Sequence, residues 1–378
     1  MRKRSVKIGN FLRRADTFLL VICTALALFG IVAIASVTDG NAKNIIVQTA
    51  SVGIGIGMFV LFTVIDADLI ADKWKILVAL SAVFILGLLF IGEGDELGNR
   101  AWYRFLGIGI QPSEIVKVVY IVLMANQISL YKDRRTLDKP LSVGLLLGHF
   151  FVIFGLLFIV TSDLGSALIY LAIFIVMLVA GGLSWYWLGI GAAAAAAVIP
   201  LAWTHVFKEY QRERILAPYD PTIDPNSVGI RWQTTRTMNA MKSGRFQGVG
   251  LGNGQLNIDA KHTDCIFASI GEEMGMIACL LILLVLTVII IRCCIIGLRS
   301  GSTFGMLICF GVAASIAFQT FINVGMCMGI SPVIGITLPF VSYGGSSIVA
   351  IYAAIGLVSG VKYRPKPQRH NISVAVDQ

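Results

Sequence analysis

Long apolar runs, separated by short polar segments, make up most of the chain. Each run is close to the ~20 residues that an α-helix needs to cross the hydrocarbon core of a bilayer. The pattern therefore predicts an all-α polytopic membrane protein with about ten transmembrane helices. We place these helices at residues 17–37, 46–65, 75–92, 115–131, 141–160, 164–183, 185–202, 265–291, 303–325 and 344–361.

The one large polar segment, residues 203–263, forms a loop between the seventh and eighth helices. It is too small for an independent domain, and proline-marked turns divide it. We expect a short exposed helix over residues 208–214 and a second over residues 231–241. Prolines and glycines are also dense in residues 331–347, which predicts irregular backbone that is buried in protein or lines a wet cavity.

Composition agrees with this fold class, since 57% of the residues are hydrophobic and 13% are charged, against about 25% charged in a soluble domain. Basic residues gather before residue 16, in the loop 132–139 and after residue 361, and ten helices put these three places on one side. That side is cytoplasmic by the positive-inside rule. We predict a single integral membrane domain over residues 1–378, with 1–16 and 362–378 in the cytoplasm and 203–263 outside.

The net charge of +9 reflects this topology and attraction to anionic lipid. No basic stripe interleaved with aromatic residues is present, so the sequence predicts no nucleic-acid partner.

The stretch from Lys261 to Gly275 carries acidic residues from a polar loop into an apolar helix, and Asp264 lies at the junction. A carboxylate there is costly to desolvate unless it is paired or faces a wet cavity, which predicts a functional residue. The structural alternative is a helix cap, because Asp is a good N-cap and stabilises the positive end of the helix dipole.

The region before the fourth helix holds a second group of polar residues. Glu114 and Lys117 are three residues apart and therefore share a helix face. Apart from Lys75 at the first position of the third helix, Lys117 is the only basic residue that our boundaries place inside a membrane helix, and a buried ammonium needs an anion. The alternative is a surface ion pair at the water boundary, with Trp102 in an interfacial aromatic belt.

Asp163 lies between two apolar runs with almost no loop, so its carboxylate is expected at membrane depth. It is a candidate site residue, and equally a candidate N-cap of the sixth helix.

Together these features resemble the shape, elongation, division and sporulation (SEDS) family, typified by RodA and FtsW, over residues 17–361. The motifs that carry the resemblance are Arg100-Ala101-Trp102, Gln111-Pro112-Ser113-Glu114 with Lys117, Asp163-Leu164-Gly165-Ser166, Asp220-Pro221, Asp224-Pro225, Gly248-Val249-Gly250, His262-Thr263-Asp264 with Gly271-Glu272-Glu273, and Leu338-Pro339-Phe340-Val341-Ser342-Tyr343-Gly344-Gly345-Ser346-Ser347. The last two are highly specific. They do not separate elongation, division and sporulation members.

The resemblance implies a peptidoglycan glycosyltransferase of the bacterial cytoplasmic membrane, with ten helices around an outward-facing cavity. Its substrate would be lipid II, an undecaprenyl-diphosphate-linked precursor. Its partners would be a class B penicillin-binding transpeptidase and other elongasome or divisome proteins. The Asp that such proteins need for glycosyl transfer falls on Asp264. The candidate substrate-binding residues are Lys117, Glu114, Trp102, Arg100, Asp163, His262 and Ser342.

The expected reaction is attack of a sugar hydroxyl on the anomeric carbon of a lipid-linked donor, with a polyprenyl diphosphate leaving. Asp264 can act as general base, which is typically worth about 10²–10⁴-fold, or as ligand of a divalent cation, Mg²⁺ or Mn²⁺. No organic cofactor is expected. The diphosphate needs positive charge, from Lys117 and Arg100 or from the cation. Inversion from an α-linked donor to a β-linked product needs one base and no covalent intermediate.

A lipid II flippase is the alternative function. Because a flippase needs alternating access, polar groups are also expected on the cytoplasmic half of its membrane helices. Here the membrane-buried charges cluster outside, apart from Glu272 and Glu273. A non-catalytic scaffold is a third interpretation, and it leaves those charges unexplained.

Overall fold

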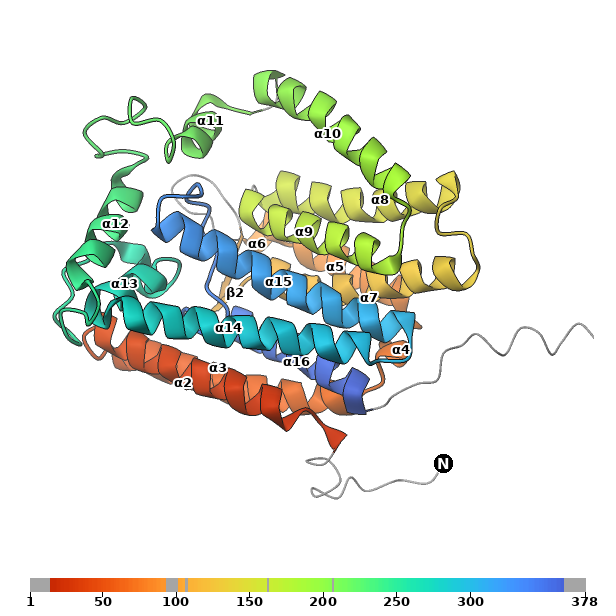
Figure 1. The fold of residues 1–378 in the computed structure, drawn as a ribbon, viewed down its shortest axis with the longest axis horizontal. Helices are drawn as coiled ribbons and strands as arrows, with labels where there is room; N and C mark the ends of the chain where they lie inside the picture. Colours follow the sequence, from red (N-terminus) through yellow and green to blue (C-terminus); the bar gives the residue numbers. More distant parts are fainter. Residues whose placement is uncertain (1–13, 93–100, 106–107, 162, 206, 364–378) are drawn as a thin grey trace, which may run out of the picture.

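The computed structural model describes residues 14–92, 101–105, 108–161, 163–205 and 207–363. Within these ranges ten helices are long and apolar enough to cross a membrane. Most of them run side by side in one bundle (Figure 1). The predicted class, an all-α protein with about ten membrane-spanning helices, is confirmed.

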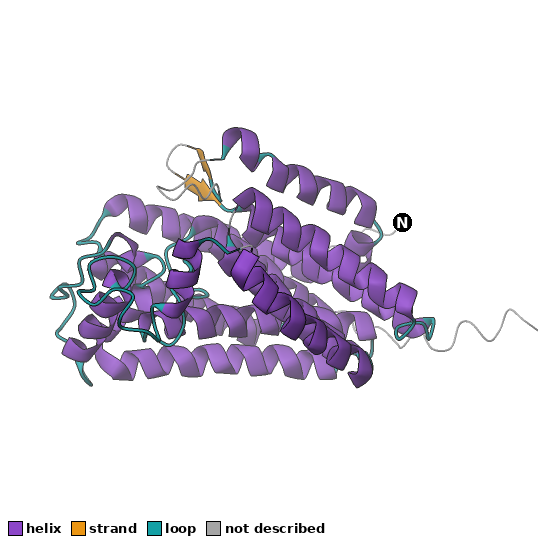
Figure 2. Cartoon of the chain, turned by 90° about the horizontal axis from the view of Figure 1, so that it is seen from above, coloured by secondary structure: helices purple, strands orange, loops and turns teal. Residues whose placement is uncertain are grey.

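The spanning elements are α2 (Thr17–Val37), α3 (Ala42–Val64), α5 and α6 (Trp74–Leu86 and Leu88–Ile91), α7 (Pro112–Asp133), α8 with the π-helical turn η1 (Pro140–Leu156 and Leu157–Thr161), α9 (Leu164–Gly181), α10 (Trp185–His205), α14 (Gly275–Leu298), α15 (Thr303–Cys327) and α16 (Gly345–Tyr363). The shorter elements are α4 (Ala67–Ala71), β1 (Tyr103–Phe105), β2 (Ile108–Ile110), α11 (Glu209–Leu216), α12 (Trp232–Gly244), η2 (Asp259–His262) and α13 (Ile266–Glu273). The two strands pair as an antiparallel hairpin at the edge of the bundle (Figure 2).

The core of the bundle lies along α7 and α15, and 72% of the most apolar stretch of each is buried. Helices α9 and α16 pack against them. Helix α10 is the opposite case, because none of its residues is buried, and it arches away from the other helices (Figure 1). In a membrane, the side chains of α10 therefore face lipid or a partner.

The two ends of the bundle carry different segments. The loop between α7 and α8, the start of α2 and the end of α16 lie at one end (Figure 1). Helices α11, α12 and α13 and the loops around them gather at the other. The segment predicted to lie outside is thus opposite the start of α2 and the end of α16, as the predicted topology requires.

The eighth predicted helix, residues 265–291, is wrong as one continuous span. Helix α13 ends at Glu273, and α14 starts in a new direction at Gly275. Gly275 has φ +80, and a Cβ at this position would collide with the backbone of Phe246 and Gly248. The close approach of this loop, together with the left-handed backbone that glycine permits, breaks the apolar run into two helices.

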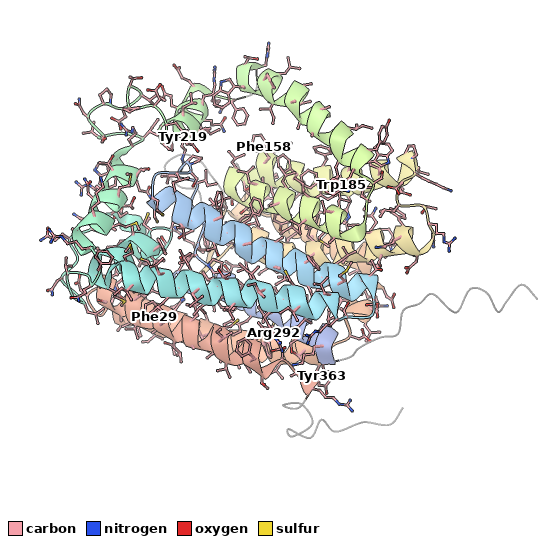
Figure 3. All side chains as sticks on the ribbon, viewed as in Figure 1. Phe29, Phe158, Trp185, Tyr219, Arg292 and Tyr363 are labelled. Atoms are coloured by element: carbon pink, nitrogen blue, oxygen red, sulfur yellow. The ribbon has the colours of Figure 1, made fainter. Side chains whose placement is uncertain are left out.

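Helix α14 also continues past residue 291, so Arg292 lies inside a spanning helix, and the expectation that Lys117 and Lys75 are the only such basic residues is wrong. Arg292 and Lys362 lie 2.7 Å and 3.1 Å from the Oδ2 atom of Asp16, which is fully buried. Figure 3 shows Arg292 and Tyr363 at this end of the bundle. The three charged groups join the ends of α2, α14 and α16.

The long polar segment begins later than predicted, because α10 extends to His205. The two short helices predicted within it are confirmed as α11 and α12. The hydroxyl of Tyr219 donates to the Ile330 carbonyl at 2.7 Å, and this bond ties the turn-rich stretch after α11 to the loop before α16 (Figure 3).

Candidate active site

A polar cavity of about 400 Å³ opens at the end of the bundle that carries α11 to α13. Its walls come from segments far apart in the sequence: the hairpin, the starts of α7 and α9, helix α11, the turn before α13 and the loop between α15 and α16. The lining residues are Ala101, Trp102, Arg104, Gln111, Asp163, Leu164, Gly165, Tyr210, Gln211, Arg214, Ile215, Thr263, Asp264, Ile334, Gly335, Thr337 and Tyr343. The sequence predicts that residues 331–347 are buried in protein or line a wet cavity, and four of them, Ile334, Gly335, Thr337 and Tyr343, line this one.

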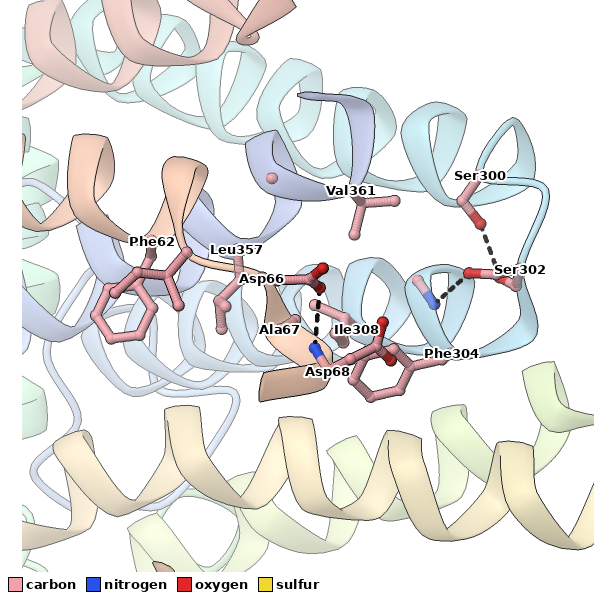
Figure 4. A pocket seen from close by; sticks show the side chains of 13 residues that line it. Phe62, Asp66, Ala67, Asp68, Ser300, Ser302, Phe304, Ile308, Leu357 and Val361 are labelled. Atoms are coloured by element: carbon pink, nitrogen blue, oxygen red, sulfur yellow. Dashed lines mark hydrogen bonds between the residues drawn. The ribbon is translucent and has the colours of Figure 1, made fainter. Parts of the chain in front are cut away.

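A smaller pocket, of about 40 Å³, lies at the opposite end (Figure 4). Its polar side chains serve local structure: Asp66 accepts the Asp68 N–H at 3.1 Å, and Ser302 accepts the Gly305 N–H at 3.1 Å. The pocket is too small for a sugar and holds none of the predicted site residues.

Asp264 lies in the turn between η2 and α13 and faces the large cavity. The N-cap position of α13 is occupied by Cys265, and no side chain accepts a capping hydrogen bond there. The alternative that Asp264 is a helix cap is therefore wrong. The pKa of the Asp264 carboxyl is raised from 3.8 to about 6, because burial and then the Asp163 carboxylate raise it more than the charge of Arg214 lowers it. Within the described residues the carboxylate accepts no hydrogen bond, so its oxygens are available to a ligand.

His262 and Ser342 support the Asp264 turn and do not line the cavity. The Ser342 hydroxyl donates to the Thr263 carbonyl at 2.7 Å and accepts the Leu338 N–H at 2.7 Å. The Tyr343 N–H donates to the His262 carbonyl at 3.0 Å. Burial, and then the charge of Lys261, lowers the pKa of His262. Both predicted residues are therefore next to the site, where they hold its backbone.

Asp163 fits both of the roles considered for it, because it is the N-cap of α9 and also lines the cavity. Its Oδ1 accepts the Ser166 N–H at 2.9 Å, and its Oδ2 accepts the Ser166 hydroxyl at 2.6 Å and the Gln111 amide at 3.2 Å. Burial raises its pKa, although the bonds from Ser166 oppose the shift. Asp163 is thus engaged on both oxygens, whereas Asp264 is not.

Glu114 and Lys117 form an ion pair of 2.7 Å inside the bundle, with 5% and 6% of each residue exposed. The Gln319 amide and the Ser347 hydroxyl also donate to Glu114, at 3.3 and 3.4 Å. Neither member of the pair lines the large cavity. The alternative of a surface pair at the water boundary is therefore wrong in its location, although the pairing itself is confirmed.

Trp102 lines the cavity, as expected of a substrate-binding residue, and Arg100 lies outside the described residues. The sequence interpretation missed Arg104 on β1 and Tyr210 and Arg214 on α11, which also line the cavity. Tyr210 and Arg214 are four residues apart and share a helix face. That spacing was visible in the sequence, but only the fold shows that this face covers the cavity.

Glu272 and Glu273 lie at the cavity end of the bundle, so the expectation that these two are the exception to the cluster of charges is wrong. The exception is Asp16, which is buried beside Arg292 at the opposite end. Glu272 accepts the N–H groups of Gln255 and Leu256 at 2.9 and 3.0 Å, and Glu273 accepts the Ser36 hydroxyl at the end of α2. The break at Gly275 explains why both carboxylates lie at this end. Glu272 and Glu273 are the last residues of α13, and the next spanning helix, α14, begins only after them.

In the part of the chain that the structure describes, no group of three or more His, Cys, Asp or Glu residues could hold a metal ion. A protein cage for a cation is therefore absent from that part. Mg²⁺ is often bound by one or two carboxylates plus substrate phosphates, and the unengaged carboxylate of Asp264 fits that simpler arrangement.

Over the ranges that the structure describes, ten apolar helices and an acid-lined polar cavity at one end of their bundle define a multi-pass membrane protein with a site for a polar ligand. The family described as "Cell cycle protein" (FTSW_RODA_SPOVE) matches residues 13–366. The chain is 30% identical over 370 residues to the "Probable peptidoglycan glycosyltransferase FtsW" of Geobacter sp. (strain M18), which covers 92% of this chain and 97% of that relative. It is 29% identical to the "Peptidoglycan glycosyltransferase MrdB" of Escherichia coli (strain K12), over 92% of this chain and 93% of that relative. The chain belongs to this family.

Two solved structures share the fold. One, described as "Structural coordination of polymerization and crosslinking by a peptidoglycan synthase complex", matches with a TM-score of 0.78 and 26% identity over 92% of this chain and 97% of that chain. The other, the rod shape determining protein RodA of Thermus thermophilus, matches with a TM-score of 0.68 and 23% identity over 92% and 96%.

Proposed function

We propose that this chain, a peptidoglycan glycosyltransferase by its family, polymerises lipid II with Asp264 as the general base. The observation that carries the proposal is the Asp264 carboxylate itself. It faces a polar cavity of about 400 Å³, accepts no hydrogen bond within the described residues, and has a pKa raised to about 6. A base whose pKa lies near the operating pH is both ionised and able to accept a proton.

The reaction forms one bond and breaks one at the same carbon. A hydroxyl oxygen of the acceptor sugar attacks the anomeric carbon of the donor, and the bond from that carbon to the diphosphate oxygen breaks. The electron pair leaves with the polyprenyl diphosphate, and the hydroxyl proton passes to Asp264. A single displacement of this kind inverts the anomeric carbon and needs one base.

Arg104 and Arg214 are the cations best placed for the leaving diphosphate, because both line the cavity that Asp264 faces. Guanidinium groups bind phosphate oxygens through paired N–H donors. Arg214 is close enough to Asp264 to lower the pKa of its carboxyl. The charge on the departing oxygens would thus develop opposite a fixed positive charge, which stabilises the transition state.

A divalent cation would be held by Asp264 together with the diphosphate of the substrate. Bound there, it would neutralise charge on the diphosphate oxygens. Asp163 is a weaker candidate ligand, since both of its oxygens already accept hydrogen bonds from Ser166 or Gln111.

The proposed location is the bacterial cytoplasmic membrane, with both termini in the cytoplasm and the cavity open to the outside. Basic residues at the end of the bundle opposite the cavity support this orientation. The proposed partner is a class B penicillin-binding transpeptidase within an elongation or division complex. The likeness to a structure described as a peptidoglycan synthase complex that coordinates polymerization and crosslinking supports it.

The flippase alternative is disfavoured by how the charges at the other end are arranged. Asp16 pairs there with both Arg292 and Lys362, and none of the three lines the cavity. A transport path would need polar groups that substrate could reach from that side.

The purified chain, with and without a class B transpeptidase, should convert lipid II into glycan ladders on a gel. Absence of polymer under both conditions, together with transbilayer movement of lipid II in vesicles, would establish the flippase instead.

A further inference from the structure

Three consecutive backbone carbonyls, those of His262, Thr263 and Asp264, each accept a hydrogen bond from the C-terminal part of the chain. The donors are the Tyr343 N–H at 3.0 Å, the Ser342 hydroxyl at 2.7 Å and the Asn323 amide at 2.7 Å. Tyr343 and Ser342 belong to the loop before α16, and Asn323 belongs to α15. The turn that carries Asp264 is therefore fixed from outside its own segment.

Asn323 has the most buried side chain of these donors, with 0% of the residue exposed. Its Nδ2 atom donates to the Asp264 carbonyl at 2.7 Å and to the Ile336 carbonyl at 2.6 Å. The orientation of the amide follows from these partners, because its oxygen cannot accept from a carbonyl. One side chain thus joins the Asp264 turn to the neighbouring loop that also lines the cavity, where Ile334 and Gly335 lie.

We propose that Asn323 is a positioning residue for the Asp264 carboxylate. The carboxylate accepts no hydrogen bond of its own within the described residues, so its position depends on its backbone. An Nδ2 atom that holds the Asp264 carbonyl fixes where the Cα–Cβ bond points. The same atom sets the distance to the Ile336 backbone, and hence the width of the cavity beside the base.

This role rests on the proposed role of Asp264 as the base. A shift of about 1 Å in a reacting group can cost about 10²-fold in rate. Asn323 does not line the cavity, so its loss should act on the chemical step and leave the binding of lipid II nearly unchanged.

The test compares Asn323→Leu with Gln127→Leu. Leucine has the same number of side-chain heavy atoms as Asn, also branching at Cγ, is bulkier because it carries two methyl groups, and removes both bonds. Gln127 is also an amide in a membrane helix, on α7, and its Oε1 lies 2.9 Å from Nδ1 of His149. Neither Gln127 nor His149 lines the cavity. Asn323→Ser serves as a second variant, since it keeps one short donor in case the leucine variant does not fold.

The measurements are kcat and KM for lipid II in detergent from pH 5 to pH 8, and the thermal stability of each protein. For Asn323→Leu we expect kcat to fall at least tenfold with KM within threefold. We also expect the acidic limb of kcat/KM to move below pH 6, because the released turn relaxes towards water. Asn323→Ser should show a smaller fall in kcat and the same direction of shift. Gln127→Leu should have the same kcat as the parent protein, and its acidic limb should lie at the same pH.

An unmoved acidic limb in the folded Asn323 variants would overturn the proposal, because loss of a merely structural bond changes stability without changing the base. A fall in activity equal to the loss of folded protein would overturn it as well. Failure of the underlying function looks different, since Asp264→Asn would then remain active whatever Asn323 does.

Discussion

The Nζ atom of Lys117 lies 2.7 Å from the Oε1 atom of Glu114, inside the bundle and apart from the cavity that Asp264 faces. In a membrane an unpaired ammonium is costly, and so is an unpaired carboxylate. The Gln319 amide and the Ser347 hydroxyl, from α15 and α16, complete the shell of Glu114. The pair therefore joins α7 to α15 and α16, the two helices on either side of the loop that lines the cavity.

The first prediction concerns this pair. Lys117→Ala should lower stability by about 3–5 kcal/mol, because it leaves a buried carboxylate without its cation, and glycan synthesis should fall at least tenfold with it. The double variant Lys117→Met with Glu114→Gln removes both charges and keeps the volumes, so thermal stability and synthesis should largely recover. A stable double variant that makes no polymer would show that Lys117 acts directly on the diphosphate.

The second prediction is the topology. Arg135→Cys should be protected from a membrane-impermeant maleimide added outside intact cells, and Asn226→Cys should be labelled. The parent protein is the control, because its cysteines are buried except Cys294, which is partly exposed. The reverse labelling pattern would show that the protein has the opposite orientation in the membrane, with the cavity open to the cytoplasm.

Most of the spanning helices could be predicted from the apolar runs, because a bilayer requires helices of nearly fixed length. The break between α13 and α14 could not be predicted in this way. The run from Cys265 onwards is apolar enough to continue, and only the approach of the backbone at Phe246 and Gly248 makes Gly275 a turn. That contact joins residues almost thirty positions apart, so no local pattern contains it.

Some residues of the candidate site could likewise be predicted from the sequence, and others could not. Asp264 and Asp163 stand out in the sequence because acids are rare beside apolar helices. Arg214 does not, since an exposed-looking helix with several charges gives no sign of which face covers a cavity. Asn323 and Gln48 could have been noticed as amides inside apolar runs. Their partners, the Asp264 carbonyl and the backbone of Ser342 and Gly344, come only from the fold.

The third prediction is that Asp264→Asn lowers polymerisation about 10²-fold or more, with no loss of thermal stability. The folded-state pKa of about 6 lies above the ordinary 3.8, so the folded protein binds the proton more tightly than the unfolded chain. The contribution of this group to stability is therefore full below about pH 4 and is lost as the pH rises through 6. At pH 7.5 the neutral Asn should be at least as stable as the parent. A wild-type ladder from this variant would remove Asp264 from the mechanism.

The fourth prediction concerns the diphosphate. Arg214→Ala should lower kcat/KM for lipid II by about 10–100-fold, since a hydrogen bond to a charged group contributes about 1.5–3 kcal/mol, and Arg214→Lys should recover part of it. Arg212→Ala is the matched control, because Arg212 lies on the same helix and does not line the cavity. Equal losses from the two alanine variants would mean that α11 matters only for its overall charge.

The fifth prediction uses the two charges that act on Asp264 in opposite directions. If Asp264 is the base, kcat/KM should rise with pH and be half-maximal near pH 6, since the carboxyl must be ionised to accept the proton. Asp163→Asn removes a negative neighbour and should move this limb to lower pH, and Asn can still cap α9. Arg214→Gln removes a positive neighbour and should move the limb to higher pH. General damage to the cavity would lower activity at every pH without moving the midpoint, so shifts of opposite sign would identify Asp264 as the titrating group. Shifts of the same sign from both variants would assign the limb to another residue.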